Sequence, residues 1–290
     1  MRTKFLLLLA MLAATLCACN TAPTPAVRPS TAGPGVHVLA QPLAMPGLGR
    51  ERKLRLYLPP SYDSLPSRRY PVIYMHDAQN LFDEATSSYG SEWGVDETMD
   101  EFARTRGFEA IVVGIDHGGD ERIHELSPWT NPKYGAAQGE QYMAFVVDTV
   151  KPFIDAHYRT LPDREHTAIA GSSLGGLMTH YALLAYPQVF GKAAILSPSY
   201  WYSSEVYTQT TAHPWRADTR AYLYIGGHEG DESEADVERM LTILRSRATA
   251  PSRITYHVVP EAKHDERAWR AEFPRAIAWL FDVPPLAPAP

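Results

Sequence analysis

The sequence predicts an α/β fold, in which a mostly parallel central sheet carries helices on both faces. Short apolar segments alternate with segments of helical period along most of the chain, an order typical of right-handed βαβ units. One apolar segment, YPVIYM at 70–75, is hydrophobic at nearly every position, which indicates a strand buried on both faces. The chain has 290 residues, 45% of them hydrophobic and 21% charged. This composition suits one globular domain of roughly 250 residues with short extensions.

The expected elements begin with two strands, at 36–43 and 53–58. The second strand alternates leucine with other residues, and two prolines at 59–60 end it because proline cannot donate a hydrogen bond to a sheet. No internal repeat or second domain boundary is found after this point. We therefore expect residues 36–283 to form a single domain.

The later elements follow the same two periods. Helices are expected where apolar residues recur every three or four positions, as at Val95, Met99 and Phe102, and strands where four to six apolar residues run together. In chain order, the expected elements are a strand at 70–75, a helix at 95–106, a strand at 110–115, a helix at 141–158, a strand at 167–170, a helix at 174–185, strands at 193–196 and 221–225, a helix at 235–247, a strand at 254–259 and a helix at 268–281.

The first 18 residues, 1–18, carry the pattern of a bacterial lipoprotein signal peptide. Arg2 and Lys4 precede an apolar run, which is long enough for the hydrophobic part of a signal but too short to span a bilayer. The sequence LCAC at 16–19 resembles a lipobox. This resemblance implies cleavage before Cys19 and lipidation of its thiol.

Export has two expected consequences. A lipid on Cys19 would anchor the protein in the bacterial cell envelope, whereas soluble secretion is the alternative. Asn20 is not the Asp that commonly retains lipoproteins at the inner membrane, so the outer membrane, on its periplasmic or surface face, is the expected place. Both cysteines lie in the signal region, and the predicted domain therefore has no disulfide despite its oxidising compartment.

Proline-rich segments flank the predicted domain. Residues 19–35 are rich in Pro, Thr, Ala and Gly and have no apolar period, which is typical of a flexible tether. Residues 284–290 form a similar tail, which we expect to fray.

The segment 167–177, TAIAGSSLGGL, joins an apolar strand to a helical pattern through a G-x-S-x-G sequence centred on Ser173. In this context the pattern is typical of the nucleophile elbow of α/β-hydrolases, a sharp turn that exposes a serine at the end of the sheet. The glycines are needed because side chains there would collide with the neighbouring strand and helix. An ordinary turn could carry the same residues, so Ser173 is a candidate nucleophile that still needs a base and an acid.

A candidate base and acid follow in the chain order of α/β-hydrolases. His264 lies in the loop after the last predicted strand, directly before the last helix, and a role at the surface is its alternative. Glu229 and Asp231 lie in the loop after the preceding strand. The order predicts a triad of Ser173, Glu229 and His264, with Asp231 as the alternative acid.

Polar and aromatic residues gather after the carboxyl ends of the predicted strands, the edge at which open α/β sheets bind ligands. Arg122 could hold an anionic group of a substrate, and His76 could contact the substrate. Trp129, Tyr200 and Trp201 could stack on a sugar or an aryl ring. For Arg122 and the three aromatic residues, a place in the core or at the surface is the alternative.

Four of these segments together resemble the bacterial putative-esterase family of α/β-hydrolases, which includes enterochelin esterases, esterase D, feruloyl esterases and the antigen 85 mycolyltransferases. The segments are MHDAQNLFD at 75–83, GSSLGG at 171–176, GGHEGDE at 226–232 and EAKHDERAWRAEFPRAIAWLF at 261–281. The resemblance implies a nucleophilic Ser173, a basic His264 and a carboxylate after the penultimate strand.

The resemblance also implies an oxyanion hole made by two backbone N–H groups. One belongs to Leu174, and the other to the loop after the strand at 70–75. Many family members have Asp-Gly-Gln in that loop, whereas this chain has Asp77-Ala78-Gln79. Both Ala78 and Gln79 are therefore candidate donors.

The expected function is hydrolysis of carboxylic esters through an acyl-enzyme, acting outside the cytoplasm on siderophore trilactones or carbohydrate esters. Acyl transfer, or a non-catalytic binding role on a hydrolase scaffold, is the alternative. The sequence has no zinc, nucleotide or dinucleotide motif, so no cofactor is expected. The formal net charge of −6 gives no reason to expect nucleic acid as a partner.

Overall fold

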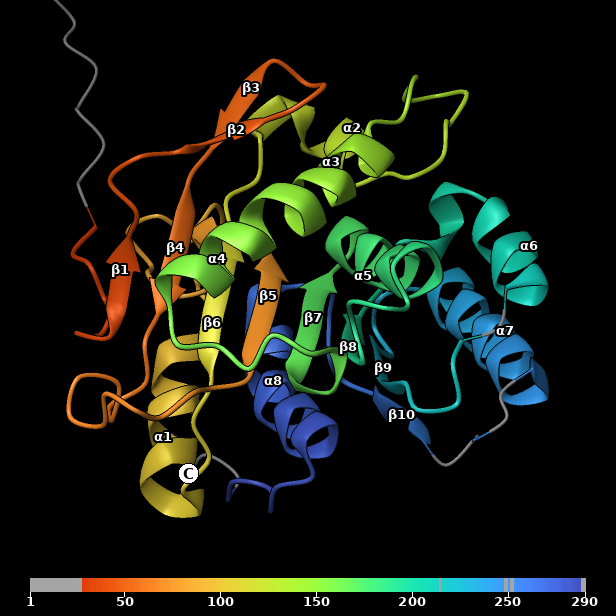
Figure 1. The fold of residues 1–290 in the computed structure, drawn as a ribbon. Coiled ribbons are helices and arrows are strands. Elements are labelled where there is room, and N and C mark those ends of the chain that lie inside the picture. Colours follow the sequence, from red (N-terminus) through yellow and green to blue (C-terminus); the bar gives the residue numbers. More distant parts are fainter. Residues whose placement is uncertain (1–27, 214, 248–249, 251–252, 288–290) are drawn as a thin grey trace, which may run out of the picture.

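The structure, a computed structural model, describes residues 28–213, 215–247, 250 and 253–287 (Figure 1). The predicted signal peptide, the lipidation site Cys19 and the first part of the predicted tether lie outside these residues. Within the described part of the chain, no helix is both long enough and apolar enough to cross a membrane.

An eight-stranded sheet forms the centre of the fold, in the order β1-β4-β6-β5-β7-β8-β9-β10. The strands are β1 (Val36–Val38), β4 (Leu54–Tyr57), β5 (Val72–His76), β6 (Ile111–Ile115), β7 (Thr167–Ser172), β8 (Lys192–Leu196), β9 (Arg220–Gly226) and β10 (Ile254–Val259). β4 runs antiparallel to both of its neighbours, and the pairs from β6 to β10 are parallel. The predicted α/β fold with a mostly parallel sheet is confirmed.

Helices cover both faces of this sheet (Figure 1). On one face lie α1 (Val95–Arg106) and α8 (Glu266–Phe281). On the other face lie α3 (Gly139–Phe145), the π-helix η3 (Val146–Val150), α4 (Lys151–His157), α5 (Leu174–Ala185), α6 (Glu205–Ala212) and α7 (Asp231–Arg247). Side chains alternate between the two faces along each strand. In β5, Ile73 and Met75 pack on the face that α1 and α8 cover, and Tyr74 packs on the opposite face. This burial on both faces explains the continuous apolar runs of the central strands.

The structure departs from the sequence expectations at the first strand. The strand expected at 36–43 ends at Val38, and β2 (Leu43–Met45) pairs instead with β3 (Arg50–Arg52) in a separate antiparallel hairpin. Gly47 and Gly49 both adopt positive φ between them, which allows the chain to turn back.

Two further differences concern helices. The helix expected at 141–158 is continuous but passes through the π-helix η3, and Pro152 follows this turn without an N–H to donate. The helical period does not predict α6. Its two large apolar buried side chains, Val206 and Tyr207, are adjacent in the sequence and do not recur every three or four positions. The remaining short helices are η1 (Ala78–Asn80), η2 (Gly119–Glu121), α2 (Arg122–Glu125), η4 (Arg164–His166) and η5 (Tyr200–Tyr202).

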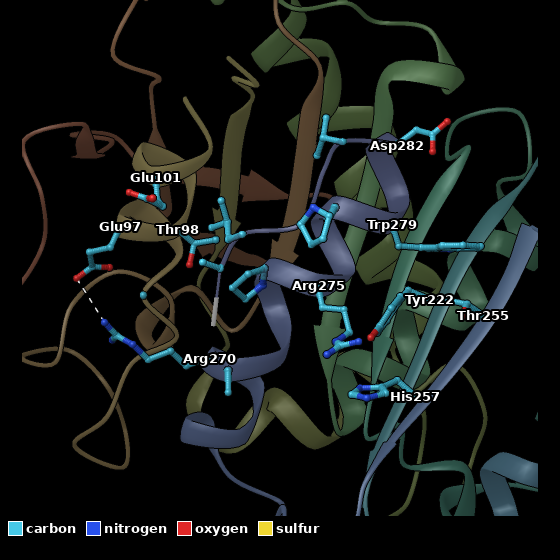
Figure 2. Close-up of a pocket in the computed structure, with 18 of the residues that line it drawn as sticks. Glu97, Thr98, Glu101, Tyr222, Thr255, His257, Arg270, Arg275, Trp279 and Asp282 are labelled. Carbon is cyan, nitrogen blue, oxygen red and sulfur yellow. Dashed lines mark ion pairs between the residues drawn. The ribbon is translucent and has the colours of Figure 1, made fainter. Parts of the chain in front are cut away.

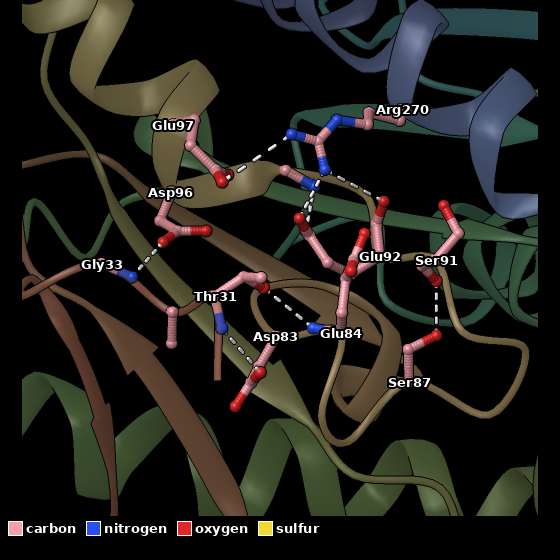
Figure 3. A network of polar contacts seen from close by, with 12 residues as sticks. Thr31, Gly33, Asp83, Glu84, Ser87, Ser91, Glu92, Asp96, Glu97 and Arg270 are labelled. Carbon is pink, nitrogen blue, oxygen red and sulfur yellow. Dashed lines mark hydrogen bonds and ion pairs between the residues drawn. The ribbon is translucent and has the colours of Figure 1, made fainter. Parts of the chain in front are cut away.

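Parts of both proline-rich flanks lie against the domain. Figure 3 shows the N-terminal contacts, in which the N–H of Thr31 donates to Asp83 at 3.1 Å and that of Gly33 donates to Asp96 at 2.7 Å. In the C-terminal tail, the carbonyl of Pro285 accepts from Arg106 at 2.8 Å. These contacts differ from the free tether and frayed tail that composition predicts, because backbone groups in both flanks find partners on the domain.

Candidate active site

Ser173 lies on a strained turn between β7 and α5. Its backbone has φ 59° and ψ −124°, a conformation that residues with a side chain rarely adopt. A Cβ on Gly171 would lie 2.8 Å from the backbone carbon of Gly175, and a Cβ on Gly176 would lie 2.7 Å from the carbonyl oxygen of Leu196. Glycine is therefore required on both sides of the serine, and the turn has the geometry of a nucleophile elbow.

Backbone hydrogen bonds fix this turn to the start of the next loop. The N–H of Ser173 donates to the carbonyl of Leu196 at 3.1 Å, and its own carbonyl accepts from the N–H of Ser199 at 3.0 Å. The hydroxyl of Ser173 lies 3.3 Å from that of Ser199. The turn therefore presents the Ser173 side chain in a defined position.

The loops after β9 and β10 bring Glu229 and His264 together. Nδ1 of His264 lies 2.6 Å from Oε2 of Glu229. Oε1 of Glu229 accepts from the Ser197 hydroxyl at 2.6 Å and from the Gly226 N–H at 2.8 Å. The Glu229 side chain is 2% exposed, whereas Asp231 is exposed at the start of α7. Of the two candidate acids, Glu229 is the one that the structure brings to the histidine.

Ser197 and Trp269 support this pair from the side of the sheet. Nε1 of Trp269 donates to the hydroxyl of Ser197 at 2.9 Å, and the Trp269 ring meets that of His264 edge to face, with centroids 5.0 Å apart. Ser197 adopts φ 43° directly after β8. No sequence pattern singles out these two residues, because their role depends on contacts between three separate loops.

Ser173, His264 and Trp269 line a cleft of about 610 Å³ at the carboxyl ends of the strands. Arg122 lies in the same wall and donates from Nε and Nη2 to the two oxygens of Asp77, at 2.6 and 2.8 Å. Other residues of the wall are Asn80, Tyr89, His117, Asp120, Asp265 and Glu266. The volume suits a small-molecule ligand.

The loop after β5 closes the cleft near the elbow. Asp77 adopts φ 58°, and η1 begins directly after it at Ala78. The Gln79 side chain donates to the carbonyl of His117 at 3.0 Å and accepts from its N–H at 2.9 Å, which ties the loop to the end of β6. The Gln79 side chain therefore faces the segment after β6, and the Ala78 side chain is buried beside Gly114. Leu174 is the first residue of α5, so its N–H has no partner within the helix.

Two of the expected substrate contacts are buried instead. His76 is 2% exposed, its Nδ1 lies 2.8 Å from the hydroxyl of Tyr142, and burial lowers its pKa to about 4. Tyr200 is 1% exposed and its hydroxyl lies 2.8 Å from Nδ1 of His180. Neither side chain lines the cleft, which corrects the expectation that they contact the substrate.

The two tryptophans also lie apart from the cleft wall. Trp129 packs edge to face against Tyr181, with centroids 5.7 Å apart. Trp201 is 54% exposed and lies 6.1 Å from the ring of Tyr134. Of the five expected contact residues, all within the described chain, Arg122 alone lines the cleft.

A larger hollow of about 1440 Å³ lies between α1, α8 and the edge strand β10 (Figure 2). His257 in its wall is 2.8 Å from Glu272, whose carboxylate also accepts from Tyr222. Neither Ser173 nor His264 lines this hollow. The elbow cleft is therefore the candidate active site.

One group of carboxylates in the described residues has spacing that suits a metal ion. Glu92, Asp96 and Glu97 each place an oxygen within 4.8 Å of the others. Arg270 forms ion pairs with Glu92 and, at 3.7 Å, with Glu97, so a guanidinium already supplies positive charge there (Figures 2 and 3). This group lies outside the wall of the elbow cleft.

Comparison with known proteins agrees with the fold. Residues 46–280 match the sequence profile described as "Putative esterase". The chain belongs to the putative esterase family. Its central sheet and strained elbow are those of an α/β-hydrolase, and ester hydrolysis is the reaction class of the family.

Individual relatives are more distant. The chain is 26% identical over 243 residues to the uncharacterized protein YbbA of Bacillus subtilis, an alignment that covers 79% of this chain and 92% of YbbA. It is 27% identical over 166 residues to ferri-bacillibactin esterase BesA of the same organism, covering 51% of this chain and 54% of BesA. Among solved structures, the enterobactin esterase FES of Shigella flexneri has a TM-score of 0.71 at 18% identity, covering 87% of this chain and 60% of FES.

Proposed function

We propose that this esterase is a serine hydrolase that forms an acyl-enzyme at Ser173, with His264 as general base and Glu229 as the acid. The observation that carries the proposal is the 2.6 Å contact between Glu229 and His264 in the cleft that Ser173 also lines. A serine nucleophile needs a base that a third group orients, and the pair of His264 and Glu229 provides both.

The proposed reaction follows from this arrangement. Glu229 accepts the Nδ1–H of His264, which leaves Nε2 free to take the proton of Ser173. Ser173 Oγ then attacks the ester carbonyl and forms a tetrahedral intermediate. His264 returns the proton to the leaving alcohol, and a water molecule, activated by the same nitrogen, releases the acid and restores Ser173.

The negative oxygen of the intermediate needs donors in fixed positions. We propose the N–H of Leu174, at the positive end of α5, and the N–H of Ala78 or Gln79 at the start of η1. Removal of one such donor typically costs about 3 kcal/mol of transition-state stabilisation. These donors are backbone N–H groups, which a substitution of the Ala78 or Gln79 side chain does not remove. The test of the reaction is therefore the loss of the nucleophile.

The substrate is proposed to be a small ester, either a siderophore trilactone or a carbohydrate ester. The names of BesA and of the Shigella FES support the first of these. We propose further that the protein is exported and anchored through a lipid on Cys19, the cysteine of the lipobox-like sequence at 16–19. Labelling with a fatty-acid analogue should mark the wild type and not Cys19→Ser, and equal labelling of both would contradict the anchor.

The test of the enzyme is hydrolysis of 4-nitrophenyl acetate and butyrate by the purified domain and by Ser173→Ala. We expect the variant to lose on the order of a thousandfold or more in kcat/KM, because the acyl-enzyme cannot form. Ser246→Ala is the matched control, since it removes an exposed serine hydroxyl on α7 that lies outside the cleft wall. Turnover by Ser173→Ala equal to that of wild type would overturn the proposal.

A further inference from the structure

The wall of the elbow cleft carries an excess of negative charge. Four carboxylates line it, those of Asp77, Asp120, Asp265 and Glu266, and Arg122 is the guanidinium that faces them. His117 also lines the wall, but burial and the nearby Arg122 lower its pKa, although Asp77 and Asp116 oppose this shift. The imidazole therefore adds little positive charge near neutral pH.

Arg122 is already engaged by Asp77. Its Nε and Nη2 donate to both oxygens of that carboxylate, and the two side chains are 27% and 10% exposed. Burial acts to raise the pKa of Asp77, but Arg122 lowers it below its ordinary value, so the carboxylate stays ionised. A substrate anion would have to displace Asp77 from a bidentate pair in order to use the guanidinium.

Asp265 has a structural partner of its own. Its Oδ1 accepts from the N–H of Ala268 at 2.9 Å, which caps the start of α8. The dipole of α8 offsets part of the charge of Asp265.

Asp120 and Glu266 are the carboxylates without a matching cation. Asp120 is exposed at the cleft mouth and forms no ion pair within the described chain. Glu266 is 5% exposed, and its side-chain partner is the amide of Asn80 at 3.5 Å. Burial, together with the charges of Asp265 and Asp77, raises the pKa of Glu266, although its own backbone N–H and the nearby His264 oppose the shift.

Resting on the proposed reaction at Ser173, we propose that the cleft selects esters without negative charge, neutral or cationic, and that Asp120 and Glu266 determine this specificity. A cleft lined by one sign of charge concentrates the field inside it and lowers the local concentration of ions of the same sign. An anionic ester that reaches Ser173 is also repelled by the partly buried carboxylates of the wall. Of the two proposed substrate classes, neutral carbohydrate esters and metal-free, uncharged trilactones meet neither barrier, whereas an anionic iron complex of a trilactone meets both.

The test compares three 4-nitrophenyl esters of equal chain length at pH 8: the neutral valerate, the anionic mono-glutarate and the cationic 5-(trimethylammonio)pentanoate. Each kcat/KM is divided by the rate at which hydroxide hydrolyses the same ester, which removes differences in intrinsic reactivity. We expect wild type to prefer the valerate over the glutarate by roughly tenfold and to accept the cation at least as well as the valerate. Added salt should narrow the preference, because it screens the charges.

Variants locate the effect. Asp120→Asn and Glu266→Gln should each reduce the preference against the glutarate, and Glu238→Gln, which removes an exposed carboxylate on α7, should leave it unchanged. Asp120 is exposed, so its variant keeps the test valid if Glu266→Gln fails to fold. A glutarate rate equal to that of the valerate in a Ser173-dependent enzyme would overturn this inference alone. Equal rates for Ser173→Ala and wild type on all three esters would overturn the proposed function as well.

Discussion

Both oxygens of the Glu229 carboxylate have partners, one in His264 and the other in Ser197 and the Gly226 N–H. These contacts leave the carboxylate little freedom to rotate, although it lies on a loop. Trp269 in turn donates to Ser197. A buried carboxylate held in this way suits the orientation of a catalytic imidazole, because it fixes both the tautomer and the direction of the ring.

At this scale the two candidate acids can be separated by substitution. We expect Glu229→Gln to lower kcat/KM for 4-nitrophenyl butyrate by roughly 10²- to 10⁴-fold, because the amide favours the wrong tautomer of His264. Asp231→Asn should have almost no effect, because Asp231 is exposed and lies outside the contacts of His264. A large loss in Asp231→Asn, with Glu229→Gln near wild type, would reverse the assignment.

At the scale of elements, the elbow depends on the close approach of α5 to the end of β8. Gly176 lies in the first turn of α5, where an alanine would place its Cβ 2.7 Å from the carbonyl oxygen of Leu196 and 3.1 Å from Cα of Pro198. These are backbone atoms, so they cannot move aside as the end of a flexible side chain can. The same two segments hold Ser173 and Ser197, so a shift of the helix would disturb both.

The substitution Gly176→Ala sets two effects against each other. Alanine favours the helix by about 1 kcal/mol over glycine, but forcing a methyl group into a packed site typically costs 1–3 kcal/mol. We expect the steric cost to exceed the gain, so that the variant unfolds at a lower temperature and loses esterase activity. A thermal midpoint at or above that of wild type, measured by circular dichroism, would show that α5 can adjust.

At the scale of the whole molecule, the strand order assembles the site. Ser173 follows β7, Ser197 follows β8, Glu229 follows β9 and His264 follows β10, and these four strands are consecutive in the sheet (Figure 1). Because the strands are parallel, all four loops emerge at the same edge. Ser173 and His264, far apart in the sequence, thereby line one cleft.

The N-terminal flank adds a link between pH and stability. Asp96 is 1% exposed and accepts from the Gly33 N–H, and the charged groups around it are Glu92, Glu97 and Arg270 (Figure 3). Burial, together with the charge of Glu97, raises the pKa of Asp96 to about 7. A carboxyl whose pKa is raised on folding stabilises the folded chain while it is protonated, and this stabilisation is lost progressively as the pH rises from the ordinary carboxyl range to about 7.

Asp96→Asn should remove this dependence, because an amide is neutral at every pH. We expect the free energy of unfolding of wild type to fall, relative to that of the variant, by about 1–3 kcal/mol between pH 5 and pH 8. Urea denaturation at both pH values measures the difference. Parallel profiles for the two proteins would mean that Asp96 does not titrate in this range.

The sequence by itself determined the alternation of strands and helices, the elbow around Ser173 and the loops that hold His264 and Glu229. These features depend on local periodicity, on glycine at a turn and on chain order, all of which can be read along one dimension. Chain order leaves Glu229 and Asp231 as the two candidate acids, and the contact of Glu229 with His264 agrees with the choice of Glu229.

The tertiary structure alone decided which polar side chains share the cleft. His76 and Tyr200 follow strands just as Arg122 does in sequence, yet the first two are buried against Tyr142 and His180. The orientation of these two side chains depends on which neighbouring side chain can form a hydrogen bond with them once the sheet has formed. The pairing of Arg122 with Asp77, and the support of Glu229 by Ser197, depend on the same long-range contacts, which no local pattern encodes.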